Sequence, residues 1–207
     1  MSALAEPKLV LGPESAGMLM TPKEFDAVEE YDESFRYELI HGVLVVSPIS
    51  LPQERGPNEL LGHYLLLYQE SHPQGSCLDL TLPQEYVRVP GGRRLADRLI
   101  WAGLGYVPDP RRETASIAVE FVSAGRRNRR RDYLEKRRDY QEAGLKEYWI
   151  IDRFQRTMTV IQLRGKKSAD KIIREGQGYE PALLPGFEVP LAKLLQAADR
   201  LGSRRKR

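Results

Sequence analysis

The segment SIAVEFVS, residues 116–123, constrains the fold most, because it is apolar on both faces apart from one carboxylate. Alternate side chains of a strand point to opposite faces, so Glu120 shares a face with Ala118 and Val122. A strand of this kind is typical of the centre of a sheet that helices cover on both sides. The opposite face carries Ile117, Val119 and Phe121.

The rest of the chain predicts the neighbours of that strand. Thr21 and Glu24 form a capping-box pattern at the start of a helix, and His41-Gly42 fits the tight turn of a hairpin. The order of elements predicts an α/β fold, more closely an α+β mixed sheet, in which helices flank a central mixed β-sheet. Helices are expected over about 20–31, 54–71 and 128–143 and near the C-terminus, and strands over 35–48 (a hairpin), 77–89, 94–103, 116–123, 146–152 and 157–163.

Length and composition fit one domain. The chain has 207 residues and no Pro/Gly/Ser-rich linker in its middle, which predicts an irregular arm over 1–20, one domain over 21–200 and a basic tail over 201–207. Cys77 is the single cysteine, so no disulfide framework can form within the chain. No stretch approaches the ~20 apolar residues of a membrane span. We therefore expect a soluble, cytoplasmic protein with no membrane partner.

A second carboxylate lies in a neighbouring strand. In RLADRLIWAG, residues 94–103, Asp97 shares a face with Leu95, Leu99 and Trp101. A buried carboxylate costs several kcal/mol unless it is paired or binds a metal. Taken alone, Glu120 fits a functional site no better than it fits an ion pair with an arginine or an exposed strand end. Two such carboxylates on neighbouring strands predict a magnesium site, because Mg²⁺ prefers oxygen ligands.

Two further residues are candidates for the same site. Glu38, in the predicted hairpin, could complete it, or could be an ordinary solvent-facing strand residue. In the helix after Glu120, Tyr133 and Tyr140 recur at helical spacing with Lys136 beside them. This stripe should face the sheet, so Lys136 could stabilise negative charge near the carboxylates. The alternative is a lysine whose stem covers the edge of the core while its ammonium reaches solvent.

The same helix begins with a dense cluster of arginines. Guanidinium groups match phosphates well, so the cluster is a candidate nucleic-acid-binding surface. A solvated helix face is the alternative interpretation of such a charge run. The net charge of +3 is too small for the whole chain to indicate a nucleic-acid binder, so the clustering carries the hypothesis. The candidate residues are Arg126, Arg127, Arg129, Arg130, Arg131 and Arg137.

Several segments together resemble a known family. They are YELIHGVLVVSP, the strand with Asp97, VEFVSAG, YLEKRRDYQEAGLKEYWIID and LPGFEVPL, in order from about Met20 to Leu195. The chain resembles the bacterial "putative restriction endonuclease" family of the PD-(D/E)XK nuclease superfamily. The resemblance implies a restriction-endonuclease-like fold and Mg²⁺-dependent (or Mn²⁺-dependent) cleavage of DNA phosphodiester bonds.

The resemblance also assigns roles to residues. Asp97 matches the metal-binding aspartate, Glu120 the acidic residue of the (D/E)XK strand, and Glu38 the glutamate of the family's hairpin. Two positions depart from the superfamily pattern: Ala96 precedes Asp97 where proline is usual, and Val122 takes the place of the usual lysine. Lys136 is the expected replacement for that lysine.

These observations predict a Mg²⁺-dependent DNA endonuclease. Asp97, Glu120, Lys136 and Glu38 are the expected catalytic residues, and Asp97 and Glu120 are the expected metal ligands. One alternative is a catalytically inactive nucleic-acid-binding protein that kept the nuclease fold, and another is an enzyme that acts on RNA or a mobile-element intermediate. DNA is the expected partner, and a twofold homodimer would suit double-strand cleavage.

Overall fold

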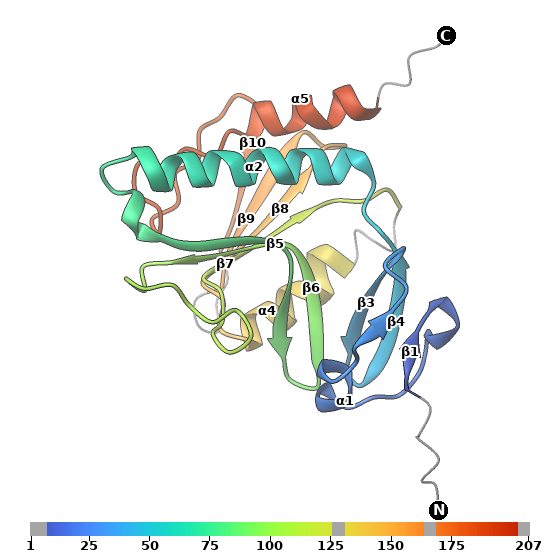
Figure 1. Cartoon of the computed structure of the whole chain (residues 1–207). Helices are drawn as coiled ribbons and strands as arrows, with labels where there is room; N and C mark the ends of the chain where they lie inside the picture. The colour runs from blue at the N-terminus through green and yellow to red at the C-terminus, as the bar shows by residue number, and fades with distance from the viewer. Residues whose placement is uncertain (1–7, 126–130, 164–168, 203–207) are drawn as a thin grey trace, which may run out of the picture.

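The computed structural model describes residues 8–125, 131–163 and 169–202, and an eight-stranded sheet forms its centre (Figure 1). The strand order is β10-β9-β8-β7-β6-β3-β4, with β5 paired to β6. The pair β7–β8 is parallel and the other pairs are antiparallel, so the predicted mixed sheet is confirmed. The strands are β3 (Phe35–Ile40), β4 (Val43–Pro48), β5 (Leu78–Val89), β6 (Gly92–Ala102), β7 (Ile117–Phe121), β8 (Glu147–Asp152), β9 (Thr157–Gln162) and β10 (Ala169–Arg174).

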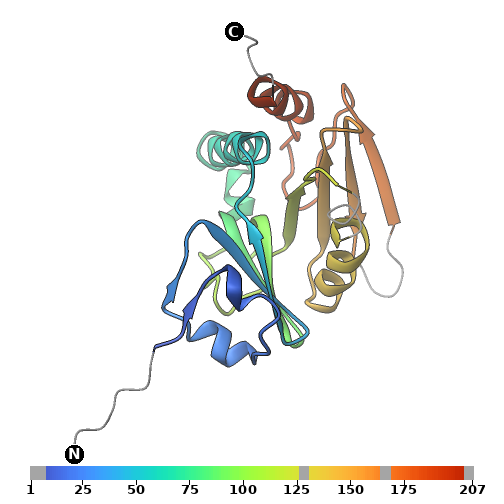
Figure 2. The same cartoon turned by 90° about the vertical axis from the view of Figure 1, so that its right-hand side faces the viewer.

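Helices lie on both faces of the sheet (Figures 1 and 2). The long helix α2 (Pro52–Ser71) and the C-terminal helix α5 (Leu191–Gly202) lie side by side over one face, and α4 (Lys136–Glu142) packs against the other. A π-helical turn, η3 (Arg131–Glu135), leads directly into α4. In the described part of the chain, no helix is both long and apolar enough to cross a membrane.

Local sequence signals account for several of these elements. Helix α1 (Pro22–Asp26) begins at Thr21, whose hydroxyl accepts a hydrogen bond from the Glu24 amide at 3.2 Å. The Glu24 carboxylate in turn accepts from the Thr21 amide, which completes the predicted capping box. Between β3 and β4, His41 and Gly42 have φ values of 48° and 80°. Two consecutive positive φ values suit the tight hairpin turn that the sequence predicts.

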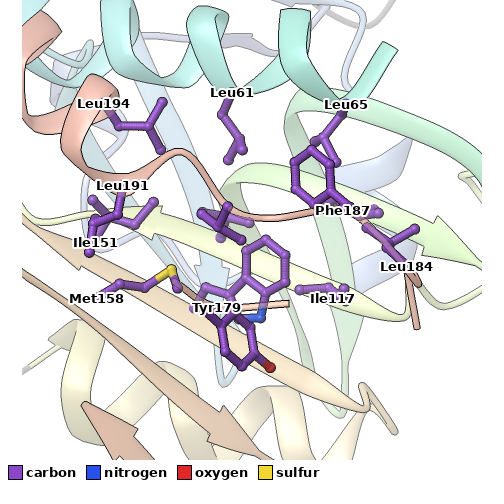
Figure 3. Packing of buried hydrophobic residues seen from close by; sticks show 14 of the residues in the cluster. Leu61, Leu65, Ile117, Ile151, Met158, Tyr179, Leu184, Phe187, Leu191 and Leu194 are labelled. Atoms are coloured by element: carbon purple, nitrogen blue, oxygen red, sulfur yellow. The ribbon is translucent and has the colours of Figure 1, made fainter. Parts of the chain in front are cut away.

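Two apolar clusters hold the helices against the sheet. Figure 3 shows the larger cluster, in which Leu61 and Leu65 of α2 and Leu194 of α5 pack onto sheet residues such as Ile117. The second cluster lies beneath α4 and includes Tyr140 and Tyr148, whose rings meet edge to face at 5.0 Å. A leucine buried as fully as Leu65 contributes about 1.5–3 kcal/mol to stability. The apolar faces of β7 therefore bury in both clusters, as the segment 116–123 predicts.

The predicted irregular arm over 1–20 needs correction for its described part. Strand β1 (Val10–Leu11) pairs in parallel with β2 (Glu30–Tyr31), and a short 3₁₀ helix, η1 (Pro13–Ser15), follows. Leu11 is buried in a third apolar cluster with Phe25 and Tyr37. Within residues 8–20, the buried apolar side chains pack against α1 and the β3–β4 hairpin. Another 3₁₀ helix, η2 (Gly75–Cys77), links α2 to β5.

Candidate active site

The candidate site lies where β6 changes its neighbour in the sheet. Near its start β6 pairs with β3 through Arg93, and further along it pairs with β7 over Arg98–Ile100. Asp97 lies between these two regions. One step beyond the pair Arg98–Val119, the antiparallel register places Asp97 opposite Glu120, so both side chains belong to the same face. The structure thus brings together the two carboxylates that the sequence singles out, and both are buried, with 7% and 3% exposure.

Hydrogen bonds fix the orientation of Asp97. Its Oδ2 accepts from the backbone amide of Phe121 at 2.8 Å, which ties it to the residue after Glu120. Its Oδ1 lies 3.2 Å from Nη1 of Arg36, which also donates to Ser50. The side-chain amide of Asn58, on α2, donates to the Asp97 carbonyl at 2.6 Å. The carboxylate is therefore held from β7 and β3, and the backbone of Asp97 is held from α2.

Glu120 is bound by two residues of α4. Its Oε1 accepts from Lys136 Nζ and from the Tyr140 hydroxyl, both at 2.8 Å. Lys136 Nζ also donates to the Leu95 carbonyl at 2.7 Å, and the residue is only 2% exposed. The helical stripe therefore faces the sheet, as predicted, and the alternative of a lysine that reaches solvent is excluded by this geometry. The catalytic role of Lys136 stays a prediction.

Glu38 completes the surroundings of the lysine. Its Oε1 accepts from the Leu95 amide at 3.2 Å and lies 3.9 Å from Lys136 Nζ. Glu38 is buried, so the interpretation as a solvent-facing strand residue is wrong. The ammonium of Lys136 thus lies between two carboxylates from different strands, β3 and β7.

Burial perturbs the site electrostatically. Loss of hydration raises the pKa of Glu120 above its ordinary value, Lys136 opposes the rise, and the charges of Asp97 and Asp132 add to it. Burial and the nearby Glu120 also raise the pKa of the Tyr140 hydroxyl, so it remains a hydrogen-bond donor. Glu120 and Asp97 therefore repel each other, and a cation between them would relieve that repulsion.

The donor set fits a hard divalent cation. Within the described ranges, no group of three or more His, Cys, Asp or Glu side chains is arranged to hold a metal. Mg²⁺ commonly takes only one or two carboxylates and fills its other positions with water and substrate phosphate. Asp97 and Glu120 would supply such a pair of oxygen ligands, without the sulfur or imidazole ligands typical of zinc.

Sequence patterns alone miss two charged residues at the site. Glu54 lies in the first turn of α2, is 3% exposed, and accepts from the Leu51 amide at 3.1 Å. Burial raises its pKa, Asp97 adds to the rise, and the Leu51 amide and Ser123 hydroxyl oppose it. A glutamate at that helical position is an ordinary capping residue, so nothing in the local sequence marks it. Arg36 is missed because Asp97, its partner, is 61 positions away.

The predicted arginine cluster lies mostly outside the described residues. Arg126, Arg127, Arg129 and Arg130 fall there, and so does the side chain of Arg131. Arg137 donates to both carboxylate oxygens of Asp170 on β10, at 2.8 and 2.9 Å. An ion pair of this geometry occupies the guanidinium fork that a phosphate would need. Among the predicted arginines, the one with a described side chain therefore links α4 to the edge strand.

A buried ion pair between β6 and α4 positions the helix that carries Lys136. Arg94 Nε lies 2.5 Å from Asp139 Oδ2, and both side chains are almost fully buried. Arg94→Met should lower the free energy of unfolding by ~3–5 kcal/mol, because the Asp139 charge would be left buried and unpaired. Urea denaturation followed by circular dichroism measures this loss. The double variant Arg94→Met/Asp139→Leu should recover most of it, and a single variant as stable as the parent would contradict the expectation.

The fold and site together define a class of protein, a restriction-endonuclease-like nuclease fold with acidic residues and a lysine on one face of the sheet. A family model described as "Putative restriction endonuclease" matches residues 22–192, and the chain belongs to this family, Uma2. A search of curated proteins found no match. Among solved structures, the chain is similar to "a putative nuclease belonging to DUF820" from Anabaena variabilis, with 13% identity and a TM-score of 0.65. The similarity covers 86% of this chain and 99% of that one, and it confirms the predicted fold.

Proposed function

We propose that the protein is a metal-dependent endonuclease that hydrolyses DNA phosphodiester bonds with Mg²⁺ or Mn²⁺. The observation that carries this proposal is the contact between Lys136 Nζ and Glu120 Oε1 at 2.8 Å, beside Asp97 on the same face. Two carboxylates and a buried lysine are the groups that a metal-assisted phosphodiester hydrolysis needs. Membership of a family described as restriction endonucleases supports the same reaction class.

Asp97 and Glu120 would hold the cation, which when bound supplies Lewis-acid activation of the phosphate and a bound water of lowered pKa. Lys136 keeps Glu120 in place and presents a positive charge where negative charge develops on the phosphate oxygens. Arg36 lies at Asp97 Oδ1 and can contact the same phosphate from the other side. Tyr140 donates to Glu120 Oε1 and so helps hold that carboxylate in one orientation.

The packing around Val122 explains why the lysine comes from the helix. Val122 is buried in the cluster beneath α4, and its amide donates to the Ile151 carbonyl at 2.9 Å. A lysine at that position would displace apolar packing. Lys136, on the helix that covers this cluster, reaches Glu120 from above the sheet.

Incubation of supercoiled plasmid DNA with the purified protein tests the proposal. We expect nicked or linear products with Mg²⁺ or Mn²⁺ and none with EDTA. DNA binding without cleavage under any divalent metal would favour the alternative, an inactive nucleic-acid-binding protein. Cleavage of RNA but not of DNA would show that RNA is the substrate.

A further inference from the structure

Strands β3 and β6 separate next to the candidate site, and a hollow of about 830 Å³ opens between them. The ladder between the two strands contains the pair Leu39–Arg93. The Tyr86 hydroxyl on β5, the strand paired with β6, donates to the Tyr37 carbonyl on β3 at 2.9 Å. We call this space the β3–β6 hollow; its walls also include α1 and the loop after β6.

Two residues that line the β3–β6 hollow contact the catalytic candidates, which do not line it themselves. Arg36 lines it and forms the ion pair with Asp97 at 3.2 Å. Leu95 also lines it, and the backbone of Leu95 bonds to Glu38 and Lys136. A ligand in the hollow would therefore contact Arg36, which binds Asp97, and Leu95, whose backbone binds Glu38 and Lys136.

The lining of the hollow contains more arginines than carboxylates, although Arg36 pairs with Asp97 outside it. Arg88 and Arg93 share one carboxylate, that of Asp26. Arg111, on the loop after β6, has an exposed side chain and no ion pair among the described residues. Four arginines line the hollow, against three carboxylates. The arginines are Arg36, Arg88, Arg93 and Arg111, and the carboxylates are Asp26, Glu33 and Glu85.

Aromatic side chains stand among these arginines. Tyr31 is 53% exposed, and its ring meets that of Tyr37 at 5.9 Å and 67°. Phe25 and Tyr86 meet edge to face at 5.5 Å. Aromatic faces beside arginines are what unpaired bases and their phosphates need, since stacking serves every base and the arginines follow the backbone.

We infer that the β3–β6 hollow binds unpaired nucleotides of a DNA strand whose neighbouring phosphate lies at Asp97. The volume falls within the ~300–1,000 Å³ of sites that enclose a drug-sized group, which suits nucleotide units and excludes a turn of duplex. The inference rests on the proposed function and narrows it, because the enzyme would prefer single-stranded or locally unpaired DNA to an uninterrupted duplex.

Fluorescence anisotropy with a labelled single-stranded oligothymidine, and with a duplex of equal length, tests the inference in the absence of divalent metal. The single strand should bind more tightly than the duplex. Tyr31→Ala should weaken its binding about tenfold, as expected for one lost base–aromatic stack. Arg111→Ala should reduce the slope of log affinity against log salt by about 0.7, one lost contact to a single-strand phosphate.

Arg112→Ala is the matched control. Arg112 neighbours Arg111 on the same loop and carries the same charge, but it is 85% exposed, pairs with Asp109 and does not line the hollow. Its removal should leave binding unchanged. Thermal denaturation verifies that all three variants fold.

Two outcomes would overturn the inference: tighter binding of the duplex, or variants Tyr31→Ala and Arg111→Ala that bind the single strand as the parent does. Either result together with Mg²⁺-dependent cleavage would leave the proposed function intact. If the single strand and the variants bind as expected but no divalent metal supports cleavage, the proposed function is wrong. The hollow would then still be a binding site for single-stranded DNA.

Discussion

Lys136→Met should lower the rate of Mg²⁺-dependent DNA cleavage by about 10²–10³-fold, the loss typical of one removed electrostatic stabiliser. Methionine keeps an unbranched stem in the space that Lys136 occupies beneath α4 and removes only the ammonium. The hydrogen bonds to Glu120 Oε1 and to the Leu95 carbonyl are then lost. A single-turnover cleavage assay with saturating DNA measures the rate of the chemical step without a contribution from binding.

Lys136→Arg tests whether any positive charge at this position is sufficient, or whether the compact ammonium is needed. Its planar guanidinium is larger than the ammonium that now lies between Glu120 and the Leu95 carbonyl, so it should not restore full activity. Both variants should bind DNA as the parent does, because Lys136 is buried. A folded Lys136→Met variant that cleaves at the parental rate would assign the lysine a structural role only.

The contact between Lys136 and Glu120 could be predicted because both residues obey local periodicities. Strand alternation places Glu120 on the face that α4 covers, and helical spacing places Lys136 beside Tyr140, the residue that shares Glu120 Oε1. The hairpin turn at His41-Gly42 and the cap at Thr21 are likewise encoded within a few residues. For these elements the sequence contains the determining interactions.

The interactions that could not be predicted join distant parts of the chain. Arg94 and Asp139 are 45 positions apart, and their burial depends on how α4 crosses β6. Arginine and aspartate are common on protein surfaces, so the sequence does not indicate that either residue is buried. The structure of residues 8–20 has the same origin, because Leu11 is buried only once the β3–β4 hairpin and α1 are in place. The β3–β6 hollow depends on where two strands part, which no local pattern encodes.

Glu120→Gln should abolish measurable Mg²⁺ binding and reduce cleavage at least as much as Lys136→Met does. The amide keeps the size of the carboxylate but removes the charge that offsets cation dehydration, and Mg²⁺ releases its waters reluctantly. Lys136 would retain Glu38, at 3.9 Å, as its nearby carboxylate, so the ammonium would stay positioned but without its closest ion pair. Isothermal titration with Mn²⁺, and then with Mg²⁺, measures the loss directly.

Glu147→Gln provides the matched control for the loss of a buried carboxylate. Glu147 Oε2 accepts from the Trp149 indole at 2.9 Å and from the Tyr179 hydroxyl at 3.0 Å, and both partners belong to the cluster beneath α2 and α5. Because that cluster covers the other face of the sheet, the variant should keep parental metal binding and cleavage. If Glu120→Gln binds Mg²⁺ like the parent while Asp97→Asn does not, the cation is held by Asp97 without Glu120. The role of Glu120 would then be to hold Lys136.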